Sequence, residues 1–308
     1  MMRALLAYDA SVGAEEAASL TVAMPWPPES IIRVVAVIEP STTAVPTVPL
    51  MPAGLAMSPQ IDAQIAQELD GQIQGVVDRL RAVGIEAGGD VLRGRAATAL
   101  IDEAQRFGAD LVIAGSRGHG TIASLVLGSV SAELVDHAPC PVLVARGSAT
   151  TRRVLFAADG SPSASDAEEI LARWPMFDDA TVRVVSVAEV VRPLPTGLAP
   201  TMYRQAIDAY AKDLQAAKSE HEGVARDAAG RLGTAGRTAD FTVRVGDAAA
   251  EILEEASSWG ADLVVLGSRG RTGISRLLLG SVARNVLQGS PSSVLIVRHA
   301  TAMPPEVS

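Results

Sequence analysis

The sequence predicts an α/β protein built from two similar domains in tandem, each with helices on both faces of a parallel sheet. The chain has 308 residues, enough for about two domains of ordinary size. Short apolar runs alternate with helix-like segments in each half, which is typical of parallel βα units. The same strings of residues also occur twice, about half a chain apart.

The repeat is clearest around a glycine-rich string. Gly108–Gly118 reads GADLVIAGSRG, and Gly260–Gly270 reads GADLVVLGSRG. Earlier in each half, Leu5–Ser11 (LLAYDAS) is similar to Leu155–Ser161 (LFAADGS). The repeating unit is therefore a whole domain, and we expect the domains to span residues 1–148 and 152–308 with a short linker around Gly147–Thr150.

The first half supplies each expected element in order. Strands are expected where apolar residues run together, at Arg3–Ala7, Ile32–Ile38, Ala87–Leu92, Leu111–Ala114 and Val142–Ala145. Helices are expected from Ser11 to about Met24, from about Ser58 to Val83, and over Ala96–Arg106 and Ser129–His137. Ser11 is the expected N-cap of the first helix, and Gly84 is expected to stop the second. The second half repeats this order, with a long helix from about Met202 to Leu232.

Composition excludes several classes of protein. The net charge is −9 and no Lys/Arg-rich run occurs, which argues against nucleic acid as a partner. No run of 18 apolar residues occurs, so we expect no membrane insertion, and the N-terminus is interpreted as a strand rather than a signal peptide. Cys140 is the only cysteine, which excludes an internal disulfide and a cysteine zinc site. We expect Cys140 to be buried and the protein to be cytoplasmic.

Each half contains a glycine arm that follows a predicted buried strand. The first is Gly115-x2-Gly118-x9-Gly128-Ser129, and the second is Gly267-x2-Gly270-x9-Gly280-Ser281. Glycines there permit positive φ and close approach of the backbone to a ligand. The Gly-Ser pairs open helices, whose free N–H groups and dipole attract phosphate, and the serines add hydroxyl donors. Turn geometry without a ligand is the alternative. Both arms lack the lysine of a Walker loop and the close glycines of a dinucleotide fingerprint.

With these residues in view, the chain resembles the universal stress proteins, in their ATP-binding, tandem two-domain form. The resemblance rests on Asp9 and Asp159 after the first strands, on the doubled glycine arms, and on the closing strands that end in Arg146 and Arg298. It covers nearly the whole chain. It implies two Rossmann-like, doubly wound domains, each with a five-stranded parallel sheet that holds ATP, with or without Mg²⁺, at its carboxyl edge.

The resemblance also implies one cofactor-binding site per domain. Asp9 and Asp159 would lie beside the nucleoside, backbone groups at Val37 and Val187 would meet adenine, and the glycine arms would hold ribose and phosphates. The residues implied in the first domain are Ala7, Asp9, Val37, Gly94, Gly115, Arg117, Gly118, Gly128, Ser129 and Val130. Those implied in the second are Ala157, Asp159, Val187, Gly246, Gly267, Arg269, Gly270, Gly280, Ser281 and Val282.

Several of these residues have a plainer interpretation. Asp9 and Asp159 would equally serve as caps of the following helices. Arg117 and Arg269 are either phosphate contacts or solvated loop charges. The first domain has Ala10 where the second has Gly160, and a Cβ there is expected to narrow the first pocket. His119 is interpreted as a surface loop residue. His137 and His221 lie in helical segments and show no partner pattern, and no metal site is expected.

The sequence predicts no catalytic residues, because phosphoryl transfer needs a metal carboxylate, a phosphate-binding lysine and a positioned base. We expect an ATP-binding stress-response regulator that acts as a switch or sensor, with at most slow hydrolysis. The alternatives are an interaction module with degenerate pockets, an adenylyl-transfer enzyme, and a binder of another adenine compound such as a cyclic nucleotide.

Partners and assembly are further expectations. ATP is expected to order the Pro-rich segments Pro40–Pro59 and Pro193–Pro200, which would control a surface for an unidentified regulatory protein. The halves are expected to pair through their last strands, Pro141–Ala145 and Ser293–Val297, and the chain is expected to form a homo-oligomer, most simply a dimer.

Overall fold

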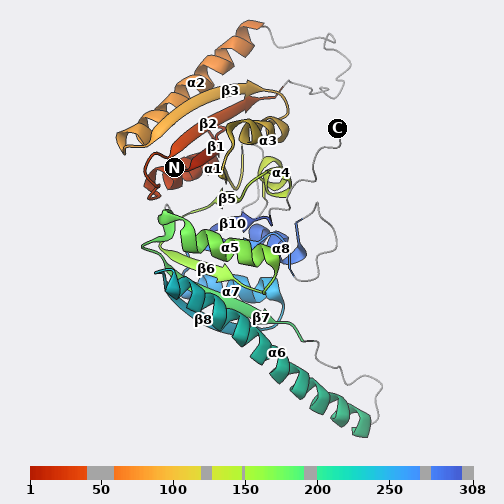
Figure 1. The fold of residues 1–308 in the computed structure, drawn as a ribbon. Coiled ribbons are helices and arrows are strands. Elements are labelled where there is room, and N and C mark those ends of the chain that lie inside the picture. The colour runs from red at the N-terminus through yellow and green to blue at the C-terminus, as the bar shows by residue number, and fades with distance from the viewer. Residues whose placement is uncertain (40–58, 119–126, 148–149, 191–199, 271–278, 300–308) are drawn as a thin grey trace, which may run out of the picture. The chain divides into compact units, whose positions relative to one another are not determined.

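A computed structural model of the chain describes residues 1–39, 59–118, 127–147, 150–190, 200–270 and 279–299. The chain divides into two compact units, Met1–Ala149 and Thr150–Ser308. Figure 1 shows strands between helices in each of them. Each unit is described by itself below.

The first unit is a parallel sheet with helices on both faces. Its elements are β1 (Arg3–Ala7), α1 (Val12–Ala23), β2 (Ile31–Ile38), α2 (Pro59–Ala82), β3 (Glu86–Arg93), α3 (Ala96–Phe107), β4 (Leu111–Gly115), α4 (Ser129–His137) and β5 (Val142–Ala145). The strand order is β3-β2-β1-β4-β5, and the strands are parallel. This is the doubly wound, five-stranded arrangement expected from the sequence.

The second unit has the same order of elements. They are β6 (Arg153–Ala157), α5 (Pro162–Arg173), η1 (Pro175–Phe177), β7 (Thr181–Ala188), α6 (Pro200–Thr234), β8 (Thr238–Val245), α7 (Ala248–Trp259), β9 (Leu263–Gly267), α8 (Ser281–Gly289) and β10 (Ser293–Val297). Its parallel strands are ordered β8-β7-β6-β9-β10. The short 3-10 helix η1 is the one element without a counterpart among the described parts of the first unit.

Aliphatic side chains make the core of each sheet. All five residues of β4 are buried, and all five of β10 are buried. Among the described residues, Phe156 and Phe177 are the largest fully buried side chains, and leucine and isoleucine side chains come next. Continuous burial along a strand requires layers on both faces, which the helices supply.

Local signals in the sequence explain where helices begin and end. Ser11 is the N-cap of α1 and accepts a hydrogen bond from Ala14 N (3.2 Å), as expected. After α2, Gly84 has φ +85°, and Ile85 N donates to Leu80 O (3.1 Å). A left-handed residue with such a bond is a common helix stop, which confirms the predicted role of Gly84.

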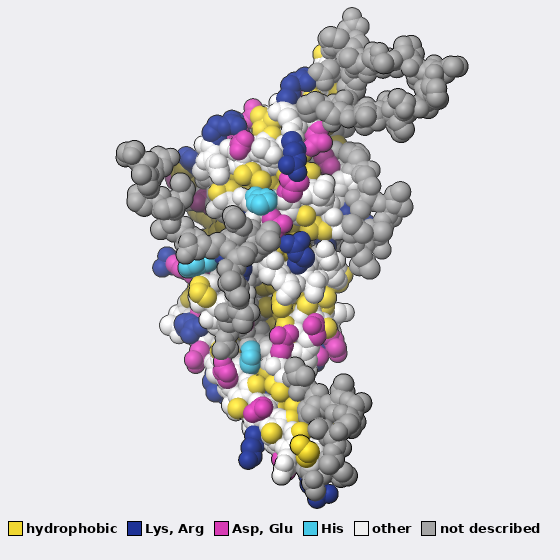
Figure 2. Space-filling model, turned by 90° about the vertical axis from the view of Figure 1, so that its right-hand side faces the viewer, with side chains coloured by type: hydrophobic (Ala, Val, Ile, Leu, Met, Phe, Trp, Pro, Cys, Tyr) yellow, Lys and Arg dark blue, Asp and Glu magenta, His cyan; other side chains and the backbone are white. Residues whose placement is uncertain are grey.

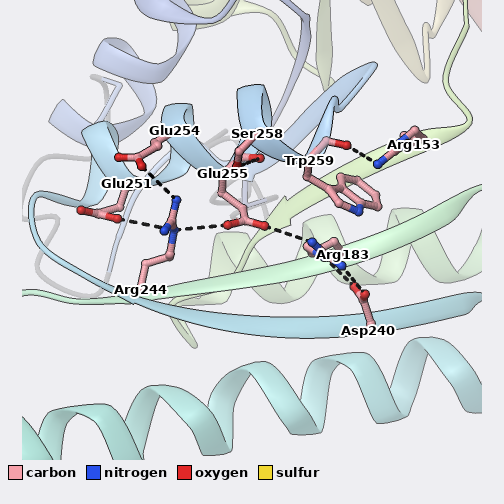
Figure 3. A network of polar contacts seen from close by, with 9 residues as sticks. All are labelled: Arg153, Arg183, Asp240, Arg244, Glu251, Glu254, Glu255, Ser258 and Trp259. Atoms are coloured by element: carbon pink, nitrogen blue, oxygen red, sulfur yellow. Dashed lines mark hydrogen bonds and ion pairs between the residues drawn. The ribbon is translucent and has the colours of Figure 1, made fainter.

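A charged network holds α7 on the sheet of the second unit (Figure 3). Glu255 is almost buried and lies 3.2 Å from both Arg183 Nη1 and Arg244 Nε. Arg183 also pairs with Asp240 (2.6 Å) and lies over the Trp259 ring, 4.9 Å from its centroid. A buried carboxylate is tolerated only when it is paired, so the two arginines compensate its burial.

The first unit has a similar network, in which Arg106 of α3 itself (2.8 Å from Glu103) takes the place of Arg244 and the aspartate has moved. Glu103 is buried and pairs with Arg33 (2.7 Å), and Arg33 pairs with Asp90. In the strand register, however, Asp90 lies opposite Val35, whereas Asp240 lies opposite Arg183 itself. Both units therefore make this arginine–aspartate pair, but the aspartate of the first unit lies two residues further along its strand than the aspartate of the second.

Burial keeps the Cys140 thiol in its protonated form at neutral pH. The side chain is buried, and burial, followed by the charge of Asp110, raises the pKa of the thiol to about 12. The expectation of a buried cysteine is confirmed.

The surface carries charges of both signs. On the face shown in Figure 2, Lys and Arg side chains alternate with Asp and Glu side chains instead of gathering into one patch. None of the described helices is long and apolar enough to cross a membrane.

The loop after the first strand has a left-handed residue in each unit. Ala10 has φ +60° and Gly160 has φ +75°. A Cβ on Gly160 would lie 3.6 Å from Val224 of α6, an ordinary contact. Ala10 carries a side chain in this left-handed conformation, which costs backbone strain. Its expected narrowing of the first pocket stays a prediction.

We predict opposite effects for exchanging these two residues. Gly160→Ala introduces left-handed strain and is expected to lower the free energy of unfolding by about 1 kcal/mol. Ala10→Gly relieves the strain but raises the conformational entropy of the unfolded chain. The net effect should be a rise of about 0.5 kcal/mol in the free energy of unfolding. Urea unfolding of the two variants measures both changes. Equal stability of Gly160→Ala and the parent chain would show that a left-handed alanine causes no strain at this position.

A second prediction concerns the buried carboxylate of the network. Glu255→Gln removes the charge that faces Arg183 and Arg244, and should lower the free energy of unfolding by about 2 kcal/mol. Glu254→Gln is the matched control, because the Glu254 side chain is 68% exposed and its ion pair with Arg244 (3.6 Å) should contribute less than about 0.5 kcal/mol. Denaturant midpoints of the two variants give the comparison. Similar losses in both would show that burial of Glu255 is unimportant.

Candidate functional site

The candidate site lies at the carboxyl edge of each sheet. In the first unit β1 lies between β2 and β4, and in the second β6 lies between β7 and β9. The chain leaves neighbouring strands toward opposite faces at this point, which opens a crevice outside the carboxyl ends. The residues expected from the sequence are brought to this edge by the ends of the parallel strands and by the loops that follow them.

Serine hydroxyls fix the loop after the fourth strand of each unit. Ser11 Oγ donates to Arg117 O, and Ser161 Oγ donates to Arg269 O, each at 3.1 Å. Both serines are also helix N-caps, so each hydroxyl accepts one bond and donates another. In the second unit Ser163 Oγ adds a bond to Arg269 O (2.5 Å). The loop is thus positioned by the first helix of its own unit.

The first glycine of each arm is required by this close packing. A Cβ on Gly115 would lie 2.3 Å from Gly13 C, and a Cβ on Gly267 would lie 2.3 Å from Ser163 Oγ. The described arm glycines do not have positive φ; the positive-φ glycines are at other positions. The expectation of positive φ in the arms is therefore wrong. The expected close approach of another group to the glycine backbone is confirmed at Gly115 and Gly267. At Gly115 and Gly267 the approaching group is a helix of the protein itself.

The aspartates after the first strands face the second glycine of each arm. Asp9 Oδ1 accepts a bond from Ser11 N (3.0 Å), and Asp159 Oδ1 accepts one from Ser161 N (2.9 Å). A Cβ on Gly118 would lie 2.6 Å from Asp9 Oδ2, which explains the glycine there. The helix N-caps are the serines, so the interpretation of Asp9 and Asp159 as N-caps is corrected: each carboxylate holds the N–H of the capping residue.

The Gly-Ser pairs begin helices as expected, but the N–H groups of the two glycines are already used in hydrogen bonds. Gly128 is the N-cap of α4 and Gly280 that of α8, but their own N–H groups donate to Ser116 O (2.9 Å) and Ser268 O (2.8 Å). The N–H groups that remain for an anion belong to the first helical turn, which precedes the first intrahelical bonds. These donors are Ser129, Val130 and Ser131 in α4, and Ser281, Val282 and Ala283 in α8.

The second unit has a cavity of about 630 Å³ at this edge. That volume is typical of small-molecule sites. Nine of the residues expected from the sequence contribute to its lining: Ala157, Asp159, Val187, Gly267, Arg269, Gly270, Gly280, Ser281 and Val282. The lining also includes residues that sequence reasoning missed: Ala158, Val185, Glu189, His221, Ala248, Ile252, Leu266, Leu279 and Ala283.

Gly246 is not among the residues that line this cavity. It has φ +154°, and a Cβ there would lie 2.7 Å from Glu251 Oε1. Its counterpart Gly94 has φ +134° with open space around the Cβ position. Backbone conformation therefore accounts for both glycines without a ligand.

Acidic residues after the second strands hold the helices that border the site. Glu39 Oε1 accepts a bond from Ala96 N (2.7 Å), and Glu189 Oε1 accepts one from Ala248 N (2.9 Å). Each glutamate satisfies a free N–H group at the start of α3 or α7. The sequence repeat could have revealed these two glutamates, because they occupy matching positions after matching strands.

Two arginines of the first unit lie near each other at the strand ends. Burial, and next the positive charge of Arg117, lower the pKa of Arg146, while Glu16 acts in the opposite direction. Arg117 itself is exposed, and in the second unit Arg269 lines the cavity. Positive charge at this edge favours an anionic ligand.

The two units differ beside the first aspartate. Tyr8 stands where the second unit has Ala158, which lines the cavity. The Tyr8 hydroxyl is hydrogen-bonded to Glu15, and this bond lowers the pKa of the Glu15 carboxyl despite its partial burial. Glu15 also pairs with Arg79 of α2 (2.9 Å).

Some expectations fall outside the described residues. These are the interior of each glycine arm, including His119, and the Pro-rich segments apart from Pro59 and Pro200, which begin α2 and α6. Within the part of the chain that the structure describes, no three His, Cys, Asp or Glu side chains form a metal-binding group. Pairing of the halves and dimer formation stay predictions.

A family model described as the universal stress protein family matches residues 1–146 and again 150–298. The chain belongs to the universal stress protein family. A universal stress protein of Mycolicibacterium smegmatis is 30% identical over 315 residues, covering 97% of this chain and 99% of that protein. One from Mycobacterium tuberculosis strain H37Rv is 31% identical over 255 residues, 75% of this chain and 74% of that protein.

The fold is shared with solved universal stress proteins. The crystal structure of one from Archaeoglobus fulgidus has a TM-score of 0.65 and 18% identity, covering 97% of this chain and 98% of that one. At this identity the likeness concerns the fold alone.

The glycine packing gives a prediction that separates fold from ligand. Gly115→Ala places a methyl group against the Gly13 backbone and should lower the free energy of unfolding by about 2–3 kcal/mol without any nucleotide present. Gly88→Ala, in β3, is the control, because no atom lies within 4 Å of its Cβ position, and it should be neutral or stabilising by about 0.5 kcal/mol. Thermal unfolding of both variants tests this, and a Gly115→Ala chain of parental stability would contradict it.

Proposed function

We propose that this universal stress protein is an ATP-binding regulator with one nucleotide site in each unit. The observation that carries the proposal is the cavity of the second unit. It combines strand ends and apolar side chains with Arg269 and the first turn of α8. An adenosine group needs an apolar slot, and phosphates need N–H donors and positive charge.

The residues proposed to bind the nucleotide follow the geometry of the edge. Val187 and Ala157 border the adenosine end, and Asp159 lies beside the nucleoside. In the second unit Gly267, Arg269, Gly270, Gly280, Ser281 and Val282 border the phosphate end. In the first unit the corresponding set is Ala7, Asp9, Val37, Gly115, Arg117, Gly118, Gly128, Ser129 and Val130. Gly94 and Gly246 are proposed to shape the loop that leads into α3 and α7.

Mg²⁺ is compatible with this arrangement. The carboxylates among the described lining residues are Asp159 and Glu189, and one Glu189 oxygen is held by Ala248 N. Mg²⁺ in nucleotide sites is usually held by one or two carboxylates together with the phosphates. Asp159 would supply such an oxygen when the metal accompanies ATP. We propose binding and regulation as the function, and slow hydrolysis at most.

Two measurements test the nucleotide. Freshly purified protein is denatured, and released compounds are identified by chromatography and mass. Protein freed of nucleotide is then titrated with ATP in a calorimeter. We expect about two ATP sites per chain. Release of another adenine nucleotide, such as a cyclic one, would replace ATP as the ligand, and no release with no ATP binding would leave an interaction module.

A charge at the start of α8 tests the phosphate end. Ser281→Glu places a negative charge in the first turn, where it favours the helix but repels phosphate. ATP affinity at the second site should fall about tenfold or more, with unchanged or slightly higher stability. Ser281→Gln keeps the size without the charge and is the matched control. Ser129→Glu and Ser129→Gln are the corresponding pair in α4. Equal ATP affinity of the Glu and Gln variants would place the phosphates elsewhere.

A further inference from the structure

One lining residue of the second cavity comes from the opposite face of the sheet. His221 belongs to α6, whereas the other described lining residues belong to strand ends, the loops after them, α7 or α8. Its ring is therefore placed at the cavity by the helix that packs on β7 and β8.

Hydrogen bonds determine which nitrogen of this ring carries a proton. Ser186 Oγ donates its single proton to Ala158 O (2.6 Å). His221 Nδ1 lies 2.8 Å from the same Oγ, so it must be the donor of that bond. The imidazole is oriented through Ser186, and in its neutral form Nε2 is a hydrogen-bond acceptor.

The first unit lacks this arrangement. Ala36 occupies the position of Ser186 in the second strand, and Leu69 occupies the position of His221. The helix correspondence is fixed by burial, because the buried residues of the two helices have the same spacing: Ile73, Val76, Val77 and Leu80 in α2, and Ala225, Ala228, Ala229 and Leu232 in α6.

We infer that His221 is a specificity-determining residue of the second site, where its neutral imidazole accepts a hydrogen bond from the nucleoside end of the ligand. Ser186 and Ala158 tie the ring to the ends of β7 and β6, away from the loop after β9 where the phosphates are proposed. The donors available there on an adenine nucleotide are the sugar hydroxyls and the adenine amino group. The inference rests on the proposed function, and it gives the two sites different selectivity.

The test uses the full chain at pH 8 with Ser129→Glu in the background to weaken the first site. Calorimetry is fitted with two sites, and the first-site affinity is held at the value measured in Ser129→Glu, Ser281→Glu. His221→Leu copies the first unit and should weaken ATP binding about tenfold, the usual effect of one lost hydrogen bond. His137→Leu is the matched control, because His137 is exposed on α4, and it should leave ATP affinity unchanged. Ser186→Ala, which also copies the first unit, frees the ring and should cause a smaller loss.

Two analogues separate recognition from a merely structural role. The first is 2′,3′-dideoxy-ATP, and the second is purine riboside triphosphate, which lacks the amino group. With His221 present, one analogue should bind about tenfold more weakly than ATP, and His221→Leu should abolish that difference. The analogue affected identifies the donor group.

Two results would overturn the inference about His221. One is unchanged ATP affinity in His221→Leu, and the other is an equal loss for ATP and both analogues. A parent chain that binds no adenine nucleotide overturns the proposed function as well, so the two failures are distinguishable.

Discussion

The close approach of the first helix to the end of the fourth strand is the constraint on which each unit depends. At Gly115 the strand backbone meets the helix backbone at Gly13, and at Gly267 it meets Ser163. This contact places the N-cap serine where its hydroxyl reaches the carbonyl of the following arginine. The first residues of the loop that borders the candidate site are therefore held by the core.

The opposite face of each sheet is fixed in a different way. Glu103 and Glu255 place charges in a buried interface, and arginines from the second strands pair with them. Aromatic rings beneath these arginines, Phe107 and Trp259, give the guanidinium groups an apolar surface on which to lie. Glu189, which follows β7, accepts a hydrogen bond from the first N–H group of α7. This bond and the charged network together hold α7, the helix that supplies Ala248 and Ile252 to the cavity.

Much of the fold could be predicted from the sequence because its signals are local. The bounds of β1, α4 and β5 agree with the expected ones, since apolar runs and a Gly-Ser start are visible in the chain itself. The conformation of the arm glycines could not be predicted, because positive φ and close packing both require glycine. His221 was missed because its partner Ser186 is 35 residues away on another element. Asp90 and Asp240 were missed because a strand register decides which arginine they meet.

The contact at Gly115 also bears on how such sequences are compared. A relative that had lost its ligand would still need a glycine at this position to keep its helix in place. The first glycine of the arm is thus a marker of architecture. The groups proposed to distinguish one ligand from another lie elsewhere, at helix starts and at side chains such as His221, whose counterpart in the first half is Leu69. Duplication within one chain allows one copy to diverge in selectivity while both copies retain the same scaffold.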